Sequence, residues 1–299
     1  MTSAEQTRGV VETRKADDTR GGSIVWRRFT RNRLAAAGAL VVVILVALAV
    51  FAPLVAPRDP LYIDMDHKFA RPGQAGFVLG ADELGRDVLS RLLHAGRVSL
   101  AVGLITAVVA VVVGAVLGAA AGFYGGAVDA MIMRVVDVLL SMPAIFLLLA
   151  LSAFLKPSMW TITLIIGLTS WMSVARMVRG QVLSLKEQEF VLAARAAGAG
   201  AGRLIVRQLM PNALAPVLVA ATLTVATAIL LESSLSYLGY GIQPPTASWG
   251  NMLNNAQTYV LYAPWVAVYP GAMISLTVLS FNFAGDGLRD ALDPRLGRS

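Results

Sequence analysis

The sequence contains no cysteine and only two histidines, His67 and His94, in 299 residues. Disulfides, thiolate nucleophiles and cysteine-ligated metal sites are therefore excluded, and a histidine-rich metal centre is not expected. Charged residues are also scarce: they make up 14% of the chain, whereas soluble domains carry about 25%. Because 57% of the residues are hydrophobic and the mean hydropathy is +0.68, the chain is predicted to cross a membrane several times.

The chain also lacks the motifs of several enzyme classes. Gly198, Gly200 and Gly202 are followed by Arg203-Leu204 and not by the Lys-Ser/Thr that a phosphate-binding loop requires. No strand is predicted before these glycines, and no HExxH motif occurs. An intramembrane serine protease would need a serine and a histidine at membrane depth, but both histidines precede the second apolar segment. ATP chemistry is therefore expected from another chain.

The net charge of +7 does not indicate nucleic-acid binding. The basic residues flank apolar segments, as the positive-inside rule expects of a membrane protein. Four arginines precede the first apolar segment and place the N-terminus in the cytoplasm: Arg27, Arg28, Arg31 and Arg33.

Six apolar segments are predicted to span the bilayer, giving an all-α polytopic fold with both termini in the cytoplasm. About 20 residues, at about 1.5 Å each, cross a hydrocarbon core of about 30 Å. The first segment is expected to be retained and not cleaved as a signal peptide. The predicted spans are residues 34–56, 100–123, 130–155, 160–178, 213–239 and 265–288.

The segments between the spans are expected to alternate between the two sides of the membrane. A helix through residues 84–93 would carry Leu84, Val88, Leu92 and Leu93 on one face, which predicts an amphipathic helix lying on the bilayer surface. The later outside loop has no charge and is predicted to fold into the mouth of a pathway. The predicted parts are cytoplasmic tails at 1–33 and 289–299, an outside loop at 57–97, and a five-helix core at 98–288 that contains a cytoplasmic loop at 180–212 and an outside loop at 241–264.

Polar residues inside the spans are candidates for a pathway or a subunit interface. Arg134 and Asp137 are three residues apart on a predicted helix, so they are expected to pair with each other. Glu232 lies in the fifth span and is followed by Ser233 and Ser236. A carboxylate inside a span usually faces a cavity or a partner, and a purely structural acid is the open alternative.

Small residues and one proline predict how the spans are shaped. Pro143 lies within the third span and is expected to kink it. Glycines at spacings of four or near multiples of four let membrane helices pack closely. In the second span these are Gly103, Gly114, Gly118 and Gly122.

The polar loop at 180–212 interrupts the apolar second half of the chain. Its middle, EQEFVLAARAA, predicts a short helix, and the glycines that follow allow a sharp exit from that helix. A second helical piece, RLIVRQLM, is predicted to stop before Pro211. This pattern indicates a helix that is held parallel to the membrane and offered to a soluble partner.

The same loop resembles the cytoplasmic EAA loop of ABC-importer permeases. That family has a Glu-Ala-Ala triplet, a glycine after three further residues, and later a Pro-Asn pair. Leu192 stands where the family has its acid, and Glu189, one turn earlier on the helix that also carries Arg195, is expected to supply the charge. The matching residues are Ala193, Ala194, Gly198, Pro211 and Asn212.

Three other segments resemble the dipeptide, oligopeptide and nickel branch of these permeases, in its second-subunit type. Two are ESSLSYLGYGIQPPTASWGNML and FNFAGDGLRDALDPR. The third precedes and enters the second span, and it comprises Gly80, Asp82, Gly85, Arg86, Asp87, Ser90, Arg91, Gly96, Arg97 and Ser99.

The resemblance implies a type I ABC-importer permease in the cytoplasmic membrane. Its implied partners are a paralogous permease, one or two cytoplasmic ATPases that bind ATP and magnesium, and an extracytoplasmic substrate-binding protein. The chain itself is then expected to be neither an enzyme nor a holder of a cofactor or metal. Small peptides are the leading cargo, with nickel chelates or glutathione as alternatives.

Two other classes remain as rival hypotheses. An ion-driven secondary transporter would need buried charges at mid-membrane and an internal repeat of the spans. A membrane scaffold that transports nothing would not need the loop at 180–212 to bind a soluble partner. Replacing Gly198 with a bulky residue discriminates between them, because it should abolish transport only if the loop couples an ATPase to the spans.

Overall fold

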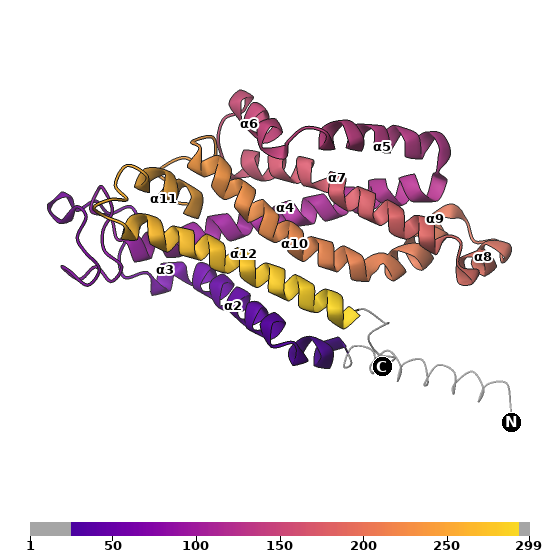
Figure 1. The fold of residues 1–299 in the computed structure, drawn as a ribbon, viewed down its shortest axis with the longest axis horizontal. Helices are drawn as coiled ribbons and strands as arrows, with labels where there is room; N and C mark the ends of the chain where they lie inside the picture. Colours follow the sequence, from indigo (N-terminus) through magenta and orange to yellow (C-terminus); the bar gives the residue numbers. More distant parts are fainter. Residues whose placement is uncertain (1–24, 293–299) are drawn as a thin grey trace.

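Long helices running roughly side by side dominate the computed structural model (Figure 1), which describes residues 25–292. The predicted tail residues 1–24 and 293–299 lie outside the described residues. The helices are α2 (Arg33–Val50), α3 (Ala52–Val55), α4 (Val88–Tyr124), α5 (Gly126–Leu140), α6 (Ala144–Phe154), α7 (Met159–Leu185), α8 (Glu189–Ala196), α9 (Ala201–Leu204), α10 (Met210–Tyr237), α11 (Trp249–Ala256) and α12 (Trp265–Leu292), with a 3-10 turn at Met65–His67 and a π-helical turn at Ile205–Leu209.

The described residues contain five helices that are long and apolar enough to cross a membrane, and a sixth span exists if the bent pair α5–α6 is counted as one. The five are α2, α4, α7, α12 and the continuous run from α9 through α10. Each of the six predicted spans therefore has a counterpart, although several begin or end elsewhere than predicted.

The amphipathic surface helix predicted at residues 84–93 is wrong. Asp87 caps the N-terminus of α4, and the helix then runs without a break for 37 residues into the second span. Leu92 and Leu93, which were expected to face lipid headgroups, are buried in the protein. No proline separates the two segments, and covering the apolar face with protein removes more of it from water than a bilayer surface would.

The small-residue stripe of α4 packs closely against other helices, as predicted: three of its glycines face α7, and Gly103 faces Ile229 of α10. A Cβ atom on Gly114 would lie 2.7 Å from Cβ of Val174, and one on Gly118 would lie 2.4 Å from the carbonyl oxygen of Ala175. Only glycine lets these two backbones approach so closely. The backbones of α4 and α7 therefore approach each other closely along this seam.

The third span is broken and not merely kinked. α5 ends at Leu140, α6 begins at Ala144, and the two axes differ by 89°. Pro143 adopts an extended backbone at the start of α6, as expected of a residue that fixes its own φ and cannot continue a helical hydrogen-bond ladder. The proline was predicted correctly, but the size of the bend was not.

The first span also breaks. α2 ends at Val50, and the short α3 follows with Pro53 in its first turn. α7 and α12 extend beyond their predicted ends, to Leu185 and Leu292, whereas α10 ends at Tyr237, two residues before its predicted end.

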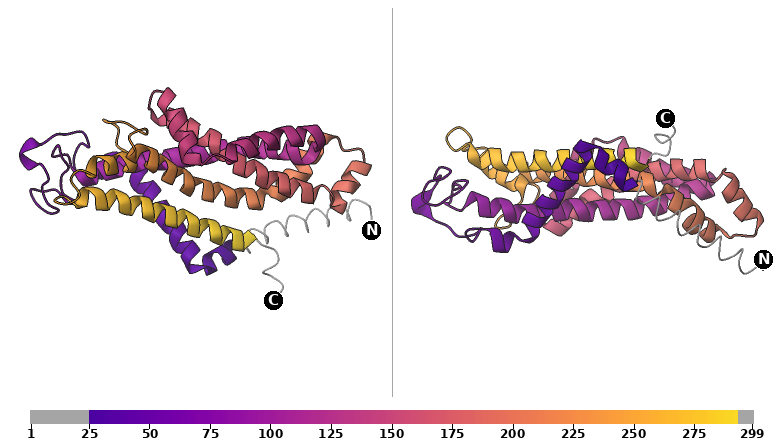
Figure 2. Two further views of the ribbon diagram at one scale, coloured as in Figure 1. Left: turned by 45° about the horizontal axis from the view of Figure 1, so that its top comes forward. Right: turned by 90° about the horizontal axis from the view of Figure 1, so that it is seen from below.

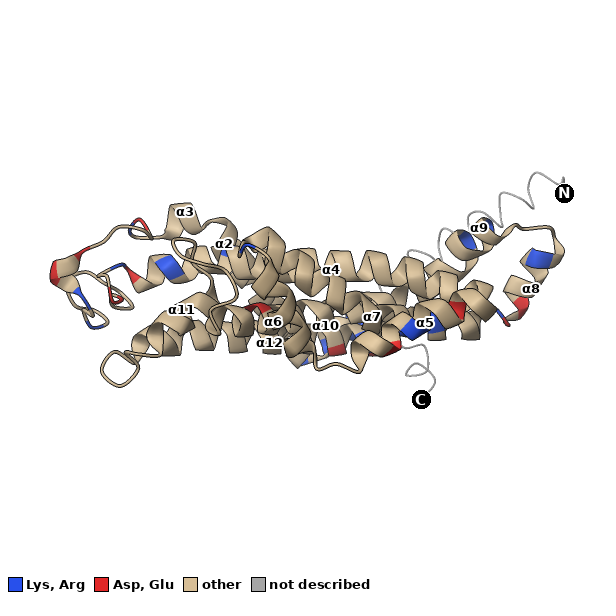
Figure 3. Cartoon of the chain, turned by 90° about the horizontal axis from the view of Figure 1, so that it is seen from above, with Lys and Arg blue, Asp and Glu red and all other residues tan. Residues whose placement is uncertain are grey.

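Charged residues concentrate toward the two ends of the molecule, and α5 carries a further group of them (Figure 3). One end holds the loop before α4 together with α11, and the opposite end holds α8 and α9 (Figures 1 and 2). This distribution is the one expected when the middle of a bundle lies in hydrocarbon and both ends lie in water. The two ends carry the candidate functional residues.

Candidate functional site

Helix α8 is held to the bundle by one face only. Val191 is fully buried in a cluster with Val182, Leu204 and Leu209. Most of the other side chains of this helix are exposed, including two large apolar ones, Phe190 (41%) and Leu192 (45%). The exposed candidates on this helix are Glu189, Ala193 and Arg195, whereas Ala194 is half-buried. The helix therefore displays a mixed apolar and charged surface beyond the end of the bundle (Figure 1).

Gly198 ends α8 in the way that the sequence predicts. Its φ of +84° lies in the left-handed region, its N–H donates to the carbonyl of Arg195, and the N–H of Ala199 donates to the carbonyl of Ala194. These two bonds form a Schellman motif, which glycine favours because it has no Cβ. The space around Gly198 is open, since a Cβ built there would meet no atom within 4 Å. The backbone conformation, and not crowding, requires glycine here.

The second helical piece does not stop before Pro211, as was predicted, but continues through it. The π-helical turn Ile205–Leu209 joins α9 to α10, and the N–H of Met210 donates to the carbonyl of Ile205. Pro211 then occupies the first turn of α10, where its missing N–H leaves no bond unmade. The wider turn accommodates a proline that would break a regular helix.

Asn212, the second residue of the Pro-Asn pair, makes a hydrogen bond to the preceding turn and lines a cavity. Its Nδ2 donates to the carbonyl of Gln208 at 2.6 Å. Its side chain also lines a cavity of about 680 Å³ together with Gln181 of α7 and Arg289 of α12. The structure thus places Asn212 at the base of the bundle and not on the exposed face of α8.

The predicted pair between Arg134 and Asp137 is wrong. Asp137 of α5 instead accepts a hydrogen bond of 2.6 Å from Arg176 of α7, and both side chains are more than half exposed. A second ion pair joins the same helices, with 2.6 Å between Nη2 of Arg179 and Oδ2 of Asp129. The spacing of three residues made an internal pair possible, but arginines on the neighbouring helix compete for the carboxylates.

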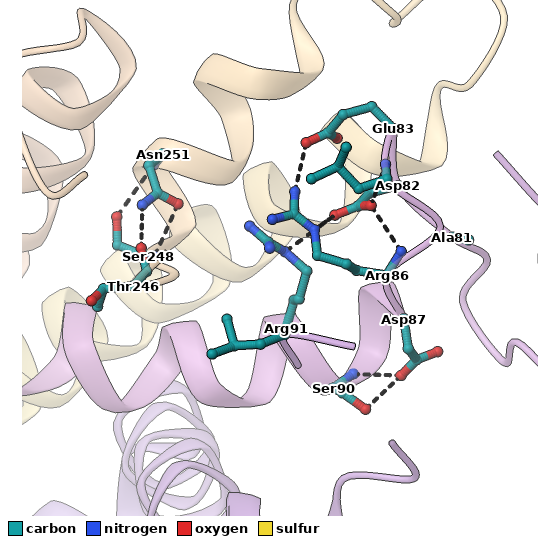
Figure 4. Close-up of polar contacts among 12 residues, drawn as sticks. Ala81, Asp82, Glu83, Arg86, Asp87, Ser90, Arg91, Thr246, Ser248 and Asn251 are labelled. Atoms are coloured by element: carbon teal, nitrogen blue, oxygen red, sulfur yellow. Dashed lines mark hydrogen bonds and ion pairs between the residues drawn. The ribbon is translucent and has the colours of Figure 1, made fainter. Parts of the chain in front are cut away.

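At the opposite end, four charged side chains form a buried network (Figure 4). The Nε of Arg86 lies 2.7 Å from Oδ2 of Asp82, and its Nη2 lies 2.6 Å from Oε1 of Glu83. The Nε of Arg91 lies 3.4 Å from the same Asp82 oxygen, and this guanidinium is 4% exposed. Buried charges are retained where they are paired in this way. The network gives a structural reason for the motif that precedes the second span.

Asp87 supplies the first turn of α4 with its cap. Its Oδ2 accepts from both the backbone N–H and the hydroxyl of Ser90, at 2.7 Å and 2.6 Å. The charged network and this cap together fold the loop back over the end of the bundle, where Nε1 of Trp265 donates to the carbonyl of Ala81. The loop is therefore part of the folded core and not a loose excursion.

Glu232 is completely buried within this chain. Its carboxylate accepts hydrogen bonds from the hydroxyls of Ser236 at 2.8 Å, Ser99 at 3.1 Å and Ser233 at 3.4 Å. Ser99 belongs to α4, so the carboxylate joins α4 to α10. No surface of Glu232 remains for a pathway or a second subunit in this structure, and its contacts are those of the structural alternative.

Helix α11 makes hydrogen bonds to α4 beside Glu232, one of them to Ser99. The backbone N–H of Trp249 donates to the Ser99 hydroxyl, and Nε1 of Trp249 donates to the carbonyl of Leu92. Ser248 and Asn251 form a capping box at its N-terminus (Figure 4). The charge-free loop thus packs as a compact element, as predicted. Its contacts with α4 could not be predicted from the sequence, because Ser99 and Trp249 lie 150 residues apart.

Comparison with known proteins identifies the family. Residues 110–298 match the family described as binding-protein-dependent transport system inner membrane component, and residues 22–72 match the N-terminal TM domain of oligopeptide transport permease C. The chain belongs to this family of permeases. It is a multi-pass membrane subunit of an ABC importer and is not itself the catalytic part of the transporter, which sets aside the secondary transporter and the scaffold.

Individual relatives cover nearly the whole permease. The di/tripeptide transport system permease protein DppC of Pseudomonas aeruginosa is 43% identical, with 91% of each chain covered. The oligopeptide transport system permease protein OppC of Bacillus subtilis is 39% identical, with 90% of this chain and 88% of that protein covered. The glutathione transport system permease protein GsiD of Escherichia coli is 42% identical, with 91% and 89% covered.

A solved structure confirms the type I importer fold. The inward-facing MetNI methionine ABC transporter matches with a TM-score of 0.55, over 69% of this permease and 98% of the matched chain. The two share 22% of their residues, so the likeness concerns the fold alone. The all-α importer architecture expected from the sequence is thereby confirmed.

Proposed function

We propose that this permease is the second membrane subunit of an ATP-driven peptide importer. It pairs with a paralogous permease, receives cargo from an extracytoplasmic binding protein, and is driven by one or two cytoplasmic ATPases that hold ATP and magnesium. Both termini then lie in the cytoplasm, on the same side as α8. The similarity to permeases named for dipeptide, tripeptide and oligopeptide transport supports peptides as the cargo.

The observation that carries this proposal is the surface of α8. This helix has one buried anchor, Val191, and an exposed face that carries apolar and charged side chains beyond the bundle. Such a face suits a groove on a soluble protein, into which an amphipathic helix lays its side chains. Glu189, Ala193, Ala194 and Arg195 would contact the ATPase, and Gly198 would fix the angle at which the helix is presented.

Coupling follows from how α8 is joined to the spans. α8 connects to α7 through a short turn and to α10 through α9 and the π-helical turn. When ATP draws two ATPases together, a helix seated in each would move with its ATPase and pull these two spans. Rigid-body motion of this kind exposes a central pathway to alternate sides of the membrane.

The test is a gentle-detergent purification of the tagged permease, with mass spectrometry of the proteins recovered and uptake of a labelled dipeptide into proteoliposomes. We expect a second permease, one or two ATPases, and uptake that requires ATP and the binding protein. Recovery of the folded chain alone, or uptake that follows an ion gradient without ATP, would contradict the proposal.

Glutathione is a second candidate cargo, favoured by the 42% identity to the glutathione permease GsiD. Glutathione is itself a tripeptide, so the same polar pathway would serve it. Competition between unlabelled glutathione and the labelled dipeptide separates the two cargoes. Nickel chelates remain an alternative that rests on the sequence resemblance only.

A further inference from the structure

Two adjoining cavities run along the groove between α7 and α10. The larger, of about 680 Å³, lies at the α8 end, and the smaller, of about 270 Å³, continues toward the middle of the bundle. Ala220 and Leu223 line both cavities, so the two form one groove. Sites for small molecules commonly have volumes of about 300–1,000 Å³, so the groove is large enough for a short peptide.

The mid-bundle part of the groove is lined by hydroxyl groups. Ser170 and Ser173 of α7 face Thr224 and Thr227 of α10 across it, and both Ser173 and Thr227 are exposed. These four residues lie within two of the helices that are apolar enough to span a membrane. Polar side chains at membrane depth are costly in lipid and usually face the interior of a bundle or a water-filled cavity.

The exposed face of α4 shows the opposite chemistry. Between residues 104 and 116 its large exposed side chains recur every four residues and are aliphatic: Leu104, Val108, Val112 and Val116. This face suits lipid or the apolar surface of another helix. The α7–α10 groove therefore presents hydrogen-bonding groups, whereas this stretch of α4 does not.

The hydroxyl oxygens that line the groove can still accept hydrogen bonds from a ligand. Ser170, Thr224 and Thr227 each donate their proton to a backbone carbonyl one turn earlier in their own helix, at 2.8, 2.7 and 3.0 Å. A hydroxyl that has donated its proton still has lone pairs that accept. A ligand that offers N–H donors, as a peptide backbone does, would find acceptors along this groove.

The α8 end of the groove is lined by amides and one cation. Gln181 and Asn212 contribute the amides, and Arg289 is the one charged residue among the described residues that line the groove. From Asn212 to Thr227 the groove follows α10 for about 22 Å, at about 1.5 Å per residue. That length covers most of a hydrocarbon core of about 30 Å.

We infer that the α7–α10 groove is this subunit's share of the peptide pathway, with Ser170, Ser173, Thr224 and Thr227 as the residues that contact the cargo backbone. The inference rests on the proposed import function. Several weak acceptors in a row suit translocation, because cargo must bind well enough to enter and weakly enough to leave. The mid-bundle part of the lining is uncharged, so side chains of either charge could pass it.

The absence of cysteine makes a direct test possible. In the assembled transporter, cysteine is introduced singly as Ser173→Cys and Thr227→Cys, with Val108→Cys and Val112→Cys on the exposed face of α4 as matched controls. Each complex, with partner cysteines replaced, is reconstituted with the binding protein and treated with a charged, membrane-impermeant thiol reagent. The labelling rate is then measured with and without an excess of dipeptide.

We expect both groove positions to be labelled at least about tenfold faster than the two control positions, because water reaches only the groove. Excess dipeptide should slow the labelling of the groove positions. Equal, slow labelling at all four positions would mean that the partner permease or lipid fills the groove, and would overturn the inference. Labelling that dipeptide leaves unchanged would show a water-filled groove that is not the peptide pathway, and would overturn it as well.

ATP-dependent dipeptide uptake by the unlabelled complexes separates this inference from the function on which it rests. If the complexes take up dipeptide but the groove cysteines are not labelled, the import function holds and only the assignment of the groove to the pathway is wrong. No uptake by the parent complex would contradict the proposed function itself. A second set of variants, Ser173→Leu and Thr227→Leu, should reduce uptake at least about tenfold by filling the groove, whereas Val108→Leu should leave uptake within about twofold.

Discussion

The two ends of this permease use polar residues in opposite ways. At the end that carries the loop before α4, the charges of Asp82, Arg86 and Arg91 are buried and paired with one another. At the end that carries α8, Glu189 and Arg195 are exposed and only Val191 anchors the helix. The network before α4 pairs its charges inside the fold, whereas α8 presents its charges to solvent.

The difference indicates that the end with α8 moves and that the end with the loop before α4 stays rigid. A network of buried, paired charges favours one arrangement, because removing one member leaves a buried charge without its partner. An exposed helix with few buried contacts belongs to the less stable part of a fold, from which moving and binding elements are drawn. Variants at the two ends should therefore change stability at one end and coupling at the other.

The largest effect is expected from Asp82→Ala. Removing this carboxylate leaves Arg86 and Arg91 with fewer partners in a buried site, which costs about 3–5 kcal/mol of stability. The measurement is the apparent melting temperature of the purified complex in detergent. The control is Asp66→Ala, an exposed carboxylate of the same loop, which should leave the melting temperature unchanged. Equal melting temperatures for Asp82→Ala and Asp66→Ala would show that the network does not stabilise this end.

Glu232→Ala should have the next largest effect on stability. It leaves the hydroxyls of Ser99 and Ser236 without their acceptor and creates a cavity, which together cost about 2–4 kcal/mol. Thermal unfolding of the complex measures this loss, and Ser234→Ala, an exposed serine on the same helix, is the matched control. If the Glu232→Ala complex kept the melting temperature of the parent complex but lost transport, the carboxylate would act in the pathway.

Gly198→Ala sharpens the comparison at the α8 end. A Cβ at φ +84° costs about 1–2 kcal/mol locally, and the end of α8 should shift to relieve it. We expect dipeptide uptake to fall several-fold while the melting temperature of the complex barely changes. Gly202→Ala is the matched control, since that glycine lies within α9 and is equally uncrowded. Equal uptake by both variants would argue that the exit angle of α8 is unimportant for coupling.

The smallest effect is expected from Asp137→Asn. Its ion pair with Arg176 is more than half exposed on both sides, and pairs of this kind contribute about 0–1 kcal/mol. The melting temperature should move by no more than a degree or two relative to the parent complex, and less at high salt. A shift as large as that of Asp82→Ala would contradict the division between a buried, stabilising end and an exposed one.

Local rules recovered a good part of this fold from the sequence. The apolar spans, a bend at Pro143, the packing glycines of α4 and the exit from α8 at Gly198 each follow from a property of the residues concerned. What failed was tertiary: the sequence could not show that the loop before α4 is covered by protein, or that Asp137 selects Arg176 over Arg134. Nor could it show that Glu232 meets Ser99, because those two residues are 133 apart.

The same limit applies to the candidate site. The residues of the exposed loop were predicted as a set because they lie on one continuous segment. The hydroxyls of the α7–α10 groove were not predicted, since Ser173 and Thr227 look like isolated polar residues until the two helices are placed side by side. A spacing of three or four residues along each helix was the only signal available from the sequence.

The most direct test of the account is a cross-link from α8 to its partner in the assembled complex. Ala193→Cys is labelled with a thiol-reactive photo-crosslinker, and Gln74→Cys, an exposed residue at the opposite end, is treated in parallel. The account predicts that Ala193→Cys cross-links to the nucleotide-binding subunit and that Gln74→Cys does not. An intact complex in which Ala193→Cys fails to reach that subunit would contradict the role assigned to α8.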